Sequence, residues 1–70
     1  MKYLIAYKQN EQYCYVSNIN QTIGTTLAYI NAIDFLSLTN AKNVCKFLNE
    51  YDTAHEYIVL TYEYTITEEK

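Results

Sequence analysis

Apolar or aromatic side chains recur at every second position over residues 57–67, and this period of two is the strongest constraint on the fold. The odd positions from 61 onward are Thr61, Glu63, Thr65 and Thr67. The even positions are all apolar or aromatic: Ile58, Leu60, Tyr62, Tyr64 and Ile66. Successive side chains of a strand point to opposite faces of a sheet, so the pattern predicts a strand with its even positions buried.

The N-terminal residues predict a β-hairpin. A turn at Asn10-Glu11 would join residues 1–9 to residues 12–19, with Lys8 opposite Tyr13. The same register pairs further residues: Tyr7 with Cys14, Ala6 with Tyr15 and Ile5 with Val16. The better core face then collects Tyr3, Ile5, Tyr7, Cys14 and Val16. Because the turn lacks the favoured Asn-Gly pair, a longer loop remains open.

The middle of the chain predicts a loop, a third strand and a helix. Residues 18–25 are polar and hold the only glycine, which indicates a loop, and residues 26–35 are rich in strand-forming side chains. Ser37 or Thr39 can cap a helix. Its apolar stripe is Ala41, Val44, Cys45, Leu48 and Tyr51. We therefore expect one α+β domain over residues 1–70, with β-β-β-α-β order and the helix on one face of an antiparallel sheet.

The charge pattern argues against nucleic acid as the partner. The net charge is −3, and all five basic residues are lysines scattered along the chain, whereas phosphate backbones are bound by clustered cations. No stretch approaches the roughly 18 apolar residues of a membrane span, and the apolar run near the start is too short for a signal peptide. We expect a cytoplasmic protein without a membrane anchor.

The sequence offers no recognisable catalytic, metal or cofactor site. Cys14 and Cys45 are too few and too far apart for a metal site, and we predict that both are free thiols in the core. The one histidine, His55, is interpreted as a solvated loop residue. No spacing places two carboxylates together as an acid–base pair. We therefore predict no enzymatic activity, no metal and no cofactor.

Nine tyrosines in 70 residues favour a binding surface. If the helix covers the face that bears Ile5, Val16, Leu60 and Tyr62, a second set of large side chains faces outward. We predict that this set binds a partner: Leu4, Tyr13, Tyr15, Tyr57 and Val59. Exposed aromatic side chains are enriched at protein interfaces. The same tyrosines could instead pair across strands to stabilise the sheet, or support self-association into a homo-oligomer.

The chain as a whole resembles small early-region proteins of phages of Gram-positive bacteria, particularly staphylococci. Those proteins combine a tyrosine-rich N-terminal hairpin, a segment of the form F-x-S-x-x-x-A-x-x-F-L and a closing Y-x-V-x-x-Y strand. The segment is matched here, with extra residues in the helix, by Phe35, Ser37, Ala41, Phe47 and Leu48. The resemblance implies a phage setting, in which small proteins often inhibit host machinery such as restriction, CRISPR or nucleotide-signalling defences.

These observations lead to one functional hypothesis and two alternatives. The hypothesis is a non-enzymatic phage-type protein that inhibits a host or anti-phage defence protein by occluding its surface. The first alternative is an oligomer whose tyrosine-lined junction sequesters a small molecule or nucleotide signal by ring stacking. The second is a structural or assembly protein without inhibitory activity.

Overall fold

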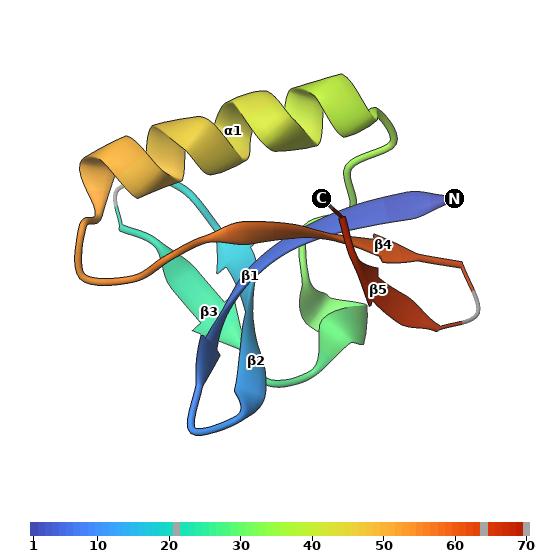
Figure 1. Ribbon diagram of the computed structural model, residues 1–70, viewed down its shortest axis with the longest axis horizontal. Helices are drawn as coiled ribbons and strands as arrows, with labels where there is room; N and C mark the ends of the chain where they lie inside the picture. The colour runs from blue at the N-terminus through green and yellow to red at the C-terminus, as the bar shows by residue number, and fades with distance from the viewer. Residues whose placement is uncertain (21, 64, 70) are drawn as a thin grey trace.

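The computed structural model describes residues 1–20, 22–63 and 65–69, which form a five-stranded antiparallel sheet with one helix across one face (Figure 1). The strand order in the sheet is β3-β2-β1-β4-β5. The elements are β1 (Lys2–Gln9), β2 (Gln12–Asn18), β3 (Gly24–Thr26), the 3₁₀ turn η1 (Tyr29–Asn31), α1 (Leu38–Tyr51), β4 (Ile58–Tyr62) and β5 (Ile66–Glu68). The predicted α+β class and β-β-β-α-β order are confirmed, and β5 is an additional strand.

The β1–β2 hairpin has the predicted register and a two-residue turn. Ala6 lies opposite Tyr15, and Lys8 lies opposite Tyr13. Asn10 and Glu11 have φ angles of 54° and 66°, so both turn residues occupy the left-handed region. Positive φ at both central positions is typical of a type I′ turn, whose twist matches that of the flanking strands. The longer loop is therefore not needed.

The prediction of a third strand over residues 26–35 is wrong, as is the loop predicted over all of residues 18–25. β3 begins inside that loop, at Gly24, and ends at Thr26 (Gln21 lies outside the described residues). The chain then forms η1, and the Ile33 N–H donates to the Val16 carbonyl at 3.0 Å. Alternation fails in this segment because apolar residues occupy consecutive positions, so it does not define one strand face.

A short stretch of chain after η1 joins the sheet by a single bridge. Tyr3 and Phe35 donate to each other's carbonyls at 2.8 and 2.9 Å, so this stretch pairs with β1. Ala32 packs in the core on one side of the sheet, whereas Ile33 and Phe35 pack in the core on the other. The chain therefore passes from one face of the sheet to the other at this point.

The helix begins where the sequence predicts. The Ser37 hydroxyl caps it by accepting from the Asn40 N–H at 3.3 Å. The buried residues of α1 are Ala41, Cys45 and Leu48, with Val44 half-buried. Tyr51 is 66% exposed, so it does not belong to the buried apolar stripe in which the sequence placed it. It lies about 60° around the helix axis from Leu48, which is enough to move its ring to the flank of α1.

The face prediction for the last strand is inverted. β4 pairs with β1 so that Ile5 lies opposite Val59 and Leu4 lies opposite Leu60. Tyr57 and Val59 therefore lie beneath α1 with Ile5, and Leu60 lies on the opposite face. Over residues 57–60 the odd and the even positions are both apolar, so alternation alone could not identify which face lies beneath α1. The predicted strand is also divided, since β4 ends and β5 begins around residues 63–65; Tyr64 lies outside the described residues.

The sheet has a core on each side. The helix-side core contains Ile5, Tyr7, Val16, Ala41, Cys45, Leu48, Tyr57 and Val59. We call the side of the sheet that faces away from α1 the outer face. The core on the outer face contains Leu4, Ala6, Tyr15 and Leu60.

Both cysteines are free thiols; burial raises the pKa of the Cys45 thiol, whereas Cys14 is only half-buried. Among the described residues, no helix is long and apolar enough to cross a membrane.

Candidate functional site

The structure separates the five residues predicted to bind a partner. Leu4, Tyr13 and Tyr15 lie on the outer face, whereas Tyr57 and Val59 lie under α1 and are 3% and 6% exposed. Leu4 and Tyr15 are also buried, so of the five only Tyr13 keeps substantial accessible surface on the outer face. The expectation that all five side chains face outward is therefore wrong.

The outer face is covered by the segment around η1, which lies on the side of the sheet away from α1 (Figure 1). Leu27 and Ile30 in this segment are 68% and 80% exposed, and Tyr29 is 42% exposed. We call these three residues the η1 ridge. Large aliphatic side chains are rarely left this accessible in groups, so the ridge is an apolar surface available to a partner.

Tyr29 of the ridge and three neighbouring tyrosines, Tyr13, Tyr15 and Tyr62, form a tyrosine cluster. The rings of Tyr29 and Tyr62 are 4.8 Å apart, and the Tyr62 hydroxyl donates to the Tyr29 hydroxyl at 3.3 Å. This hydrogen bond raises the pKa of Tyr62, with a smaller effect of burial. The rings of Tyr13 and Tyr15 are 6.0 Å apart. Burial, followed by the neighbouring Tyr13 and Tyr29 hydroxyls, raises the pKa of Tyr15, so at neutral pH its phenol is uncharged.

Two shallow hollows border the ridge. One, of about 150 Å³, is lined by Leu4, Tyr29, Ile30, Tyr62 and the ion pair in which Lys2 Nζ lies 3.4 Å from Asp34 Oδ2. The other, of about 270 Å³, is lined by Gln12, Tyr13, Tyr15 and Leu27. Both are smaller than the roughly 300–1,000 Å³ of typical small-molecule sites. The outer face thus combines protruding apolar side chains with small hollows between tyrosine rings.

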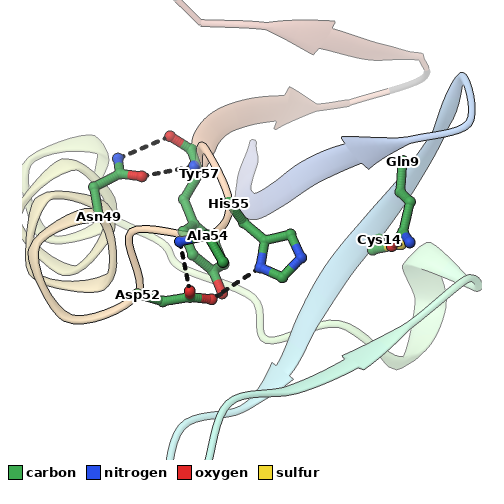
Figure 2. Close-up of polar contacts among 7 residues, drawn as sticks. All are labelled: Gln9, Cys14, Asn49, Asp52, Ala54, His55 and Tyr57. Carbon is green, nitrogen blue, oxygen red and sulfur yellow. Dashed lines mark hydrogen bonds and ion pairs between the residues drawn. The ribbon is translucent and has the colours of Figure 1, made fainter.

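A second cluster of polar groups lies at the C-terminal end of α1 (Figure 2). Asp52 Oδ2 accepts from the Tyr57 hydroxyl at 2.7 Å and from His55 Nδ1 at 3.0 Å, and Oδ1 accepts from the Ala54 N–H at 3.0 Å. The His55 hydrogen bond, then those of Tyr57 and Ala54, lower the pKa of Asp52. The His55 ring also stacks on Tyr7, with centroids 4.0 Å apart. His55 is therefore half-buried and held in place, which corrects its interpretation as a solvated loop residue.

The hydrogen bonds of the polar cluster hold the loop between α1 and β4 in place. An ionised carboxylate only accepts hydrogen bonds, so Nδ1 of His55 carries the hydrogen that faces Asp52. Burial, and then the hydrogen bond to Asp52, raise the pKa of Tyr57, so its hydroxyl stays protonated as a donor.

The Cys14 thiol lies apart from this cluster, and its hydrogen-bond partner is Gln9, at 4.0 Å (Figure 2). Among the described residues, no group of three or more His, Cys, Asp or Glu is arranged to hold a metal ion.

Asn49 connects α1 to the start of β4. Its side-chain oxygen accepts from the Tyr57 N–H at 2.7 Å, and its side-chain nitrogen donates to the Tyr57 carbonyl at 3.0 Å (Figure 2). The carboxamide therefore makes the same pair of hydrogen bonds that a neighbouring antiparallel strand would make. This contact fixes the main chain just before β4, in the segment from which His55 and Tyr57 reach Asp52.

Comparison with known proteins gives no assignment: no family model, curated protein or solved structure matches the chain.

Sequence reasoning missed the exposed residues of the η1 ridge and the polar cluster. Leu27 and Ile30 were assigned to a strand, although the interrupted alternation around them was a signal against one. Asp52 lies three residues before His55, a spacing at which a turn can bring an acid and an imidazole together. The Asn49–Tyr57 contact spans eight residues and has no sequence signature.

Proposed function

We propose that this protein is a non-enzymatic binding protein that uses the η1 ridge and the adjacent tyrosine cluster to attach to another protein. The observation that carries the proposal is the exposure of Leu27 (68%) and Ile30 (80%) beside the Tyr29–Tyr62 pair. Interfaces typically have an apolar and aromatic centre and a polar rim. Lys2 and Asp34 at one hollow, and Lys8 near the Tyr13 ring, supply such a rim.

The exposed aliphatic side chains can contribute a measurable part of the binding energy. Full burial of a leucine or isoleucine is worth about 1.5–3 kcal/mol. Scaled by their exposed fractions, Leu27 and Ile30 each contribute roughly 1–2 kcal/mol when a partner covers them. Together these contributions correspond to about a thirtyfold to thousandfold change in affinity.

The partner that we propose is a host or anti-phage defence protein in the host cytoplasm, inhibited by occlusion of its surface. The resemblance to small early-region phage proteins supports this choice. Sequestration of a nucleotide signal within the outer face of a single copy has less support, because its two hollows measure only about 150 and 270 Å³. A structural or assembly role has no specific observation in its favour.

Affinity capture tests the proposal. The tagged protein is incubated with a lysate of a staphylococcal host, and the retained proteins are compared with those retained by the double variant Leu27→Ser/Ile30→Ser. We expect one host protein to be retained by the parent chain and lost with the double variant. Circular dichroism and thermal unfolding of the double variant show whether the fold is intact; both side chains are largely exposed, so it should be.

Lys42→Ala is the matched control, because Lys42 is exposed on α1, on the other side of the sheet from the ridge. This variant should retain the same host protein as the parent chain. Loss of the host protein with Lys42→Ala but not with the double variant would move the binding surface to α1. Retention of the host protein by both variants would refute the ridge as the binding surface.

A further inference from the structure

α1 carries a second group of exposed apolar residues, and Figure 1 shows no described element on the side of α1 that faces away from the sheet. Phe47 and Tyr51 are 58% and 66% exposed, and their rings lie 6.2 Å apart at an interplanar angle of 14°. Phe47 lies about 200° around the helix axis from buried Cys45, and Tyr51 lies on the adjoining flank of α1, about 60° from buried Leu48. This aromatic pair is separate from the η1 ridge, which lies on the opposite side of the sheet.

Two opposite charges accompany the aromatic pair. Lys46 and Glu50 are exposed and four residues apart, so they form a row on the helix surface next to Phe47 and Tyr51. A parallel helix related by a two-fold axis would place the two rows on opposite edges of the contact, where the charges could not pair. An antiparallel helix reverses the sequence direction, so a two-fold axis near Leu48 places each Lys46 beside the Glu50 of the other copy. The row is therefore complementary to itself in the antiparallel arrangement only.

The same axis also fits the aromatic rings together. With a rise of about 1.5 Å per residue, it brings Phe47 of the second copy to the level of Asn49 and Tyr51 of the second copy to the level of Cys45. The four rings then alternate between the copies at spacings of about 3 Å along the helix, as interleaved side chains do. Charge and ring positions thus agree on one axis, and this agreement favours a second copy as the occupant of the surface.

We propose that two copies of this chain associate through antiparallel packing of α1, with Phe47 and Tyr51 at the centre and two Lys46–Glu50 pairs along one edge. The aromatic side chains of one copy would lose roughly 250 Å² of accessible surface, from about 150–250 Å² for each full ring. Even with their neighbours, this area is below the roughly 800 Å² per partner of a standard interface. The dimer is therefore weak and forms at high protein concentration, and it leaves the η1 ridge free.

Sedimentation velocity of the full chain over a range of concentrations tests the proposal. We expect the parent chain to shift from monomer to dimer as its concentration rises, and Phe47→Ser to remain monomeric. Lys46→Glu and Glu50→Lys should each weaken association roughly tenfold, because each replaces two favourable edge pairs with two like-charge pairs. The double variant Lys46→Glu/Glu50→Lys should restore association, because it exchanges the two charges and recreates both pairs.

Lys8→Glu is the matched control, since it makes the same charge change at an exposed position of β1, away from α1. It should associate as the parent chain does, and circular dichroism shows whether each variant keeps its helix. The proposal is overturned if the parent chain stays monomeric at every concentration, or if Phe47→Ser associates normally. It is also overturned if the double charge exchange associates no better than either single variant.

Discussion

Replacing Asn49 by alanine removes both hydrogen bonds between the helix and the main chain of Tyr57. The bonds measure 2.7 and 3.0 Å, and Tyr57 is 3% exposed, so its backbone groups have little other access to a partner. An unsatisfied buried backbone group costs about 1–3 kcal/mol. The two groups together would cost about 2–6 kcal/mol, and water entering the groove beside them reduces this to an expected loss of about 2–4 kcal/mol.

That groove, of about 460 Å³, lies between α1 and β4 and is lined by Asn49 and Tyr57 among others. Urea unfolding followed by circular dichroism measures the loss as a lower free energy of unfolding. Asn49→Asp provides a graded comparison, since a carboxylate can accept from the Tyr57 N–H but cannot donate to its carbonyl. We expect Asn49→Asp to be destabilised as well, because its negative charge faces that carbonyl.

Asn43→Ala is the matched control, because Asn43 is exposed on the same helix and alanine is the better helix former. Its free energy of unfolding should stay within about 0.5 kcal/mol of that of the parent chain. If Asn49→Ala lowered the free energy of unfolding no more than Asn43→Ala, the Asn49 carboxamide would not hold the main chain at the start of β4. The reasoning from unsatisfied backbone groups would then be wrong.

Three further changes test other parts of the structure. Leu60→Ala should lower the free energy of unfolding by about 2–5 kcal/mol, because Leu60 is fully buried, whereas Thr61→Ala should cost well under half of that; equal losses in urea unfolding would contradict the packing. Glu11→Gly should raise the melting temperature, since Glu11 has a φ of 66°, and an unchanged or lower value would contradict the turn geometry. Asp52 has a lowered pKa, so its stabilisation is present above its unfolded-state pKa of about 3.9 and is lost as the pH falls through its folded-state pKa. Asp52→Asn should therefore be less stable at neutral pH and lose less stability on acidification than the parent chain, whereas parallel stability–pH curves would contradict this.

Local patterns in the sequence were sufficient for the hairpin and the helix start. The β1–β2 register follows from a two-residue turn and apolar alternation, and the α1 start follows from a serine that can accept from a main-chain N–H three residues on. Each of these features depends on residues that are close in the sequence. The same is true of the α+β class, which follows from the order of periodic segments.

The inverted face of β4 shows where local patterns fail. Its pairing with β1 joins residues more than fifty positions apart, and a shift of one residue exchanges the two faces of a strand. The candidate site depends on the same kind of contact. Tyr29 meets Tyr62 across 33 positions, and the η1 segment covers the outer face only because β3 ends after three residues. The tyrosine count predicted a binding surface but could not identify which rings remain accessible.

The binding surface is tested most directly by mapping backbone amide resonances of the isotopically labelled protein as the captured partner is added. We expect the largest changes at residues 27–30 and at Tyr13, and small changes at Lys42 and in the Asp52–His55 segment. Changes confined to α1 or to the Asp52–His55 segment, with residues 27–30 unaffected, would contradict the proposal that this protein binds its partner through the η1 ridge.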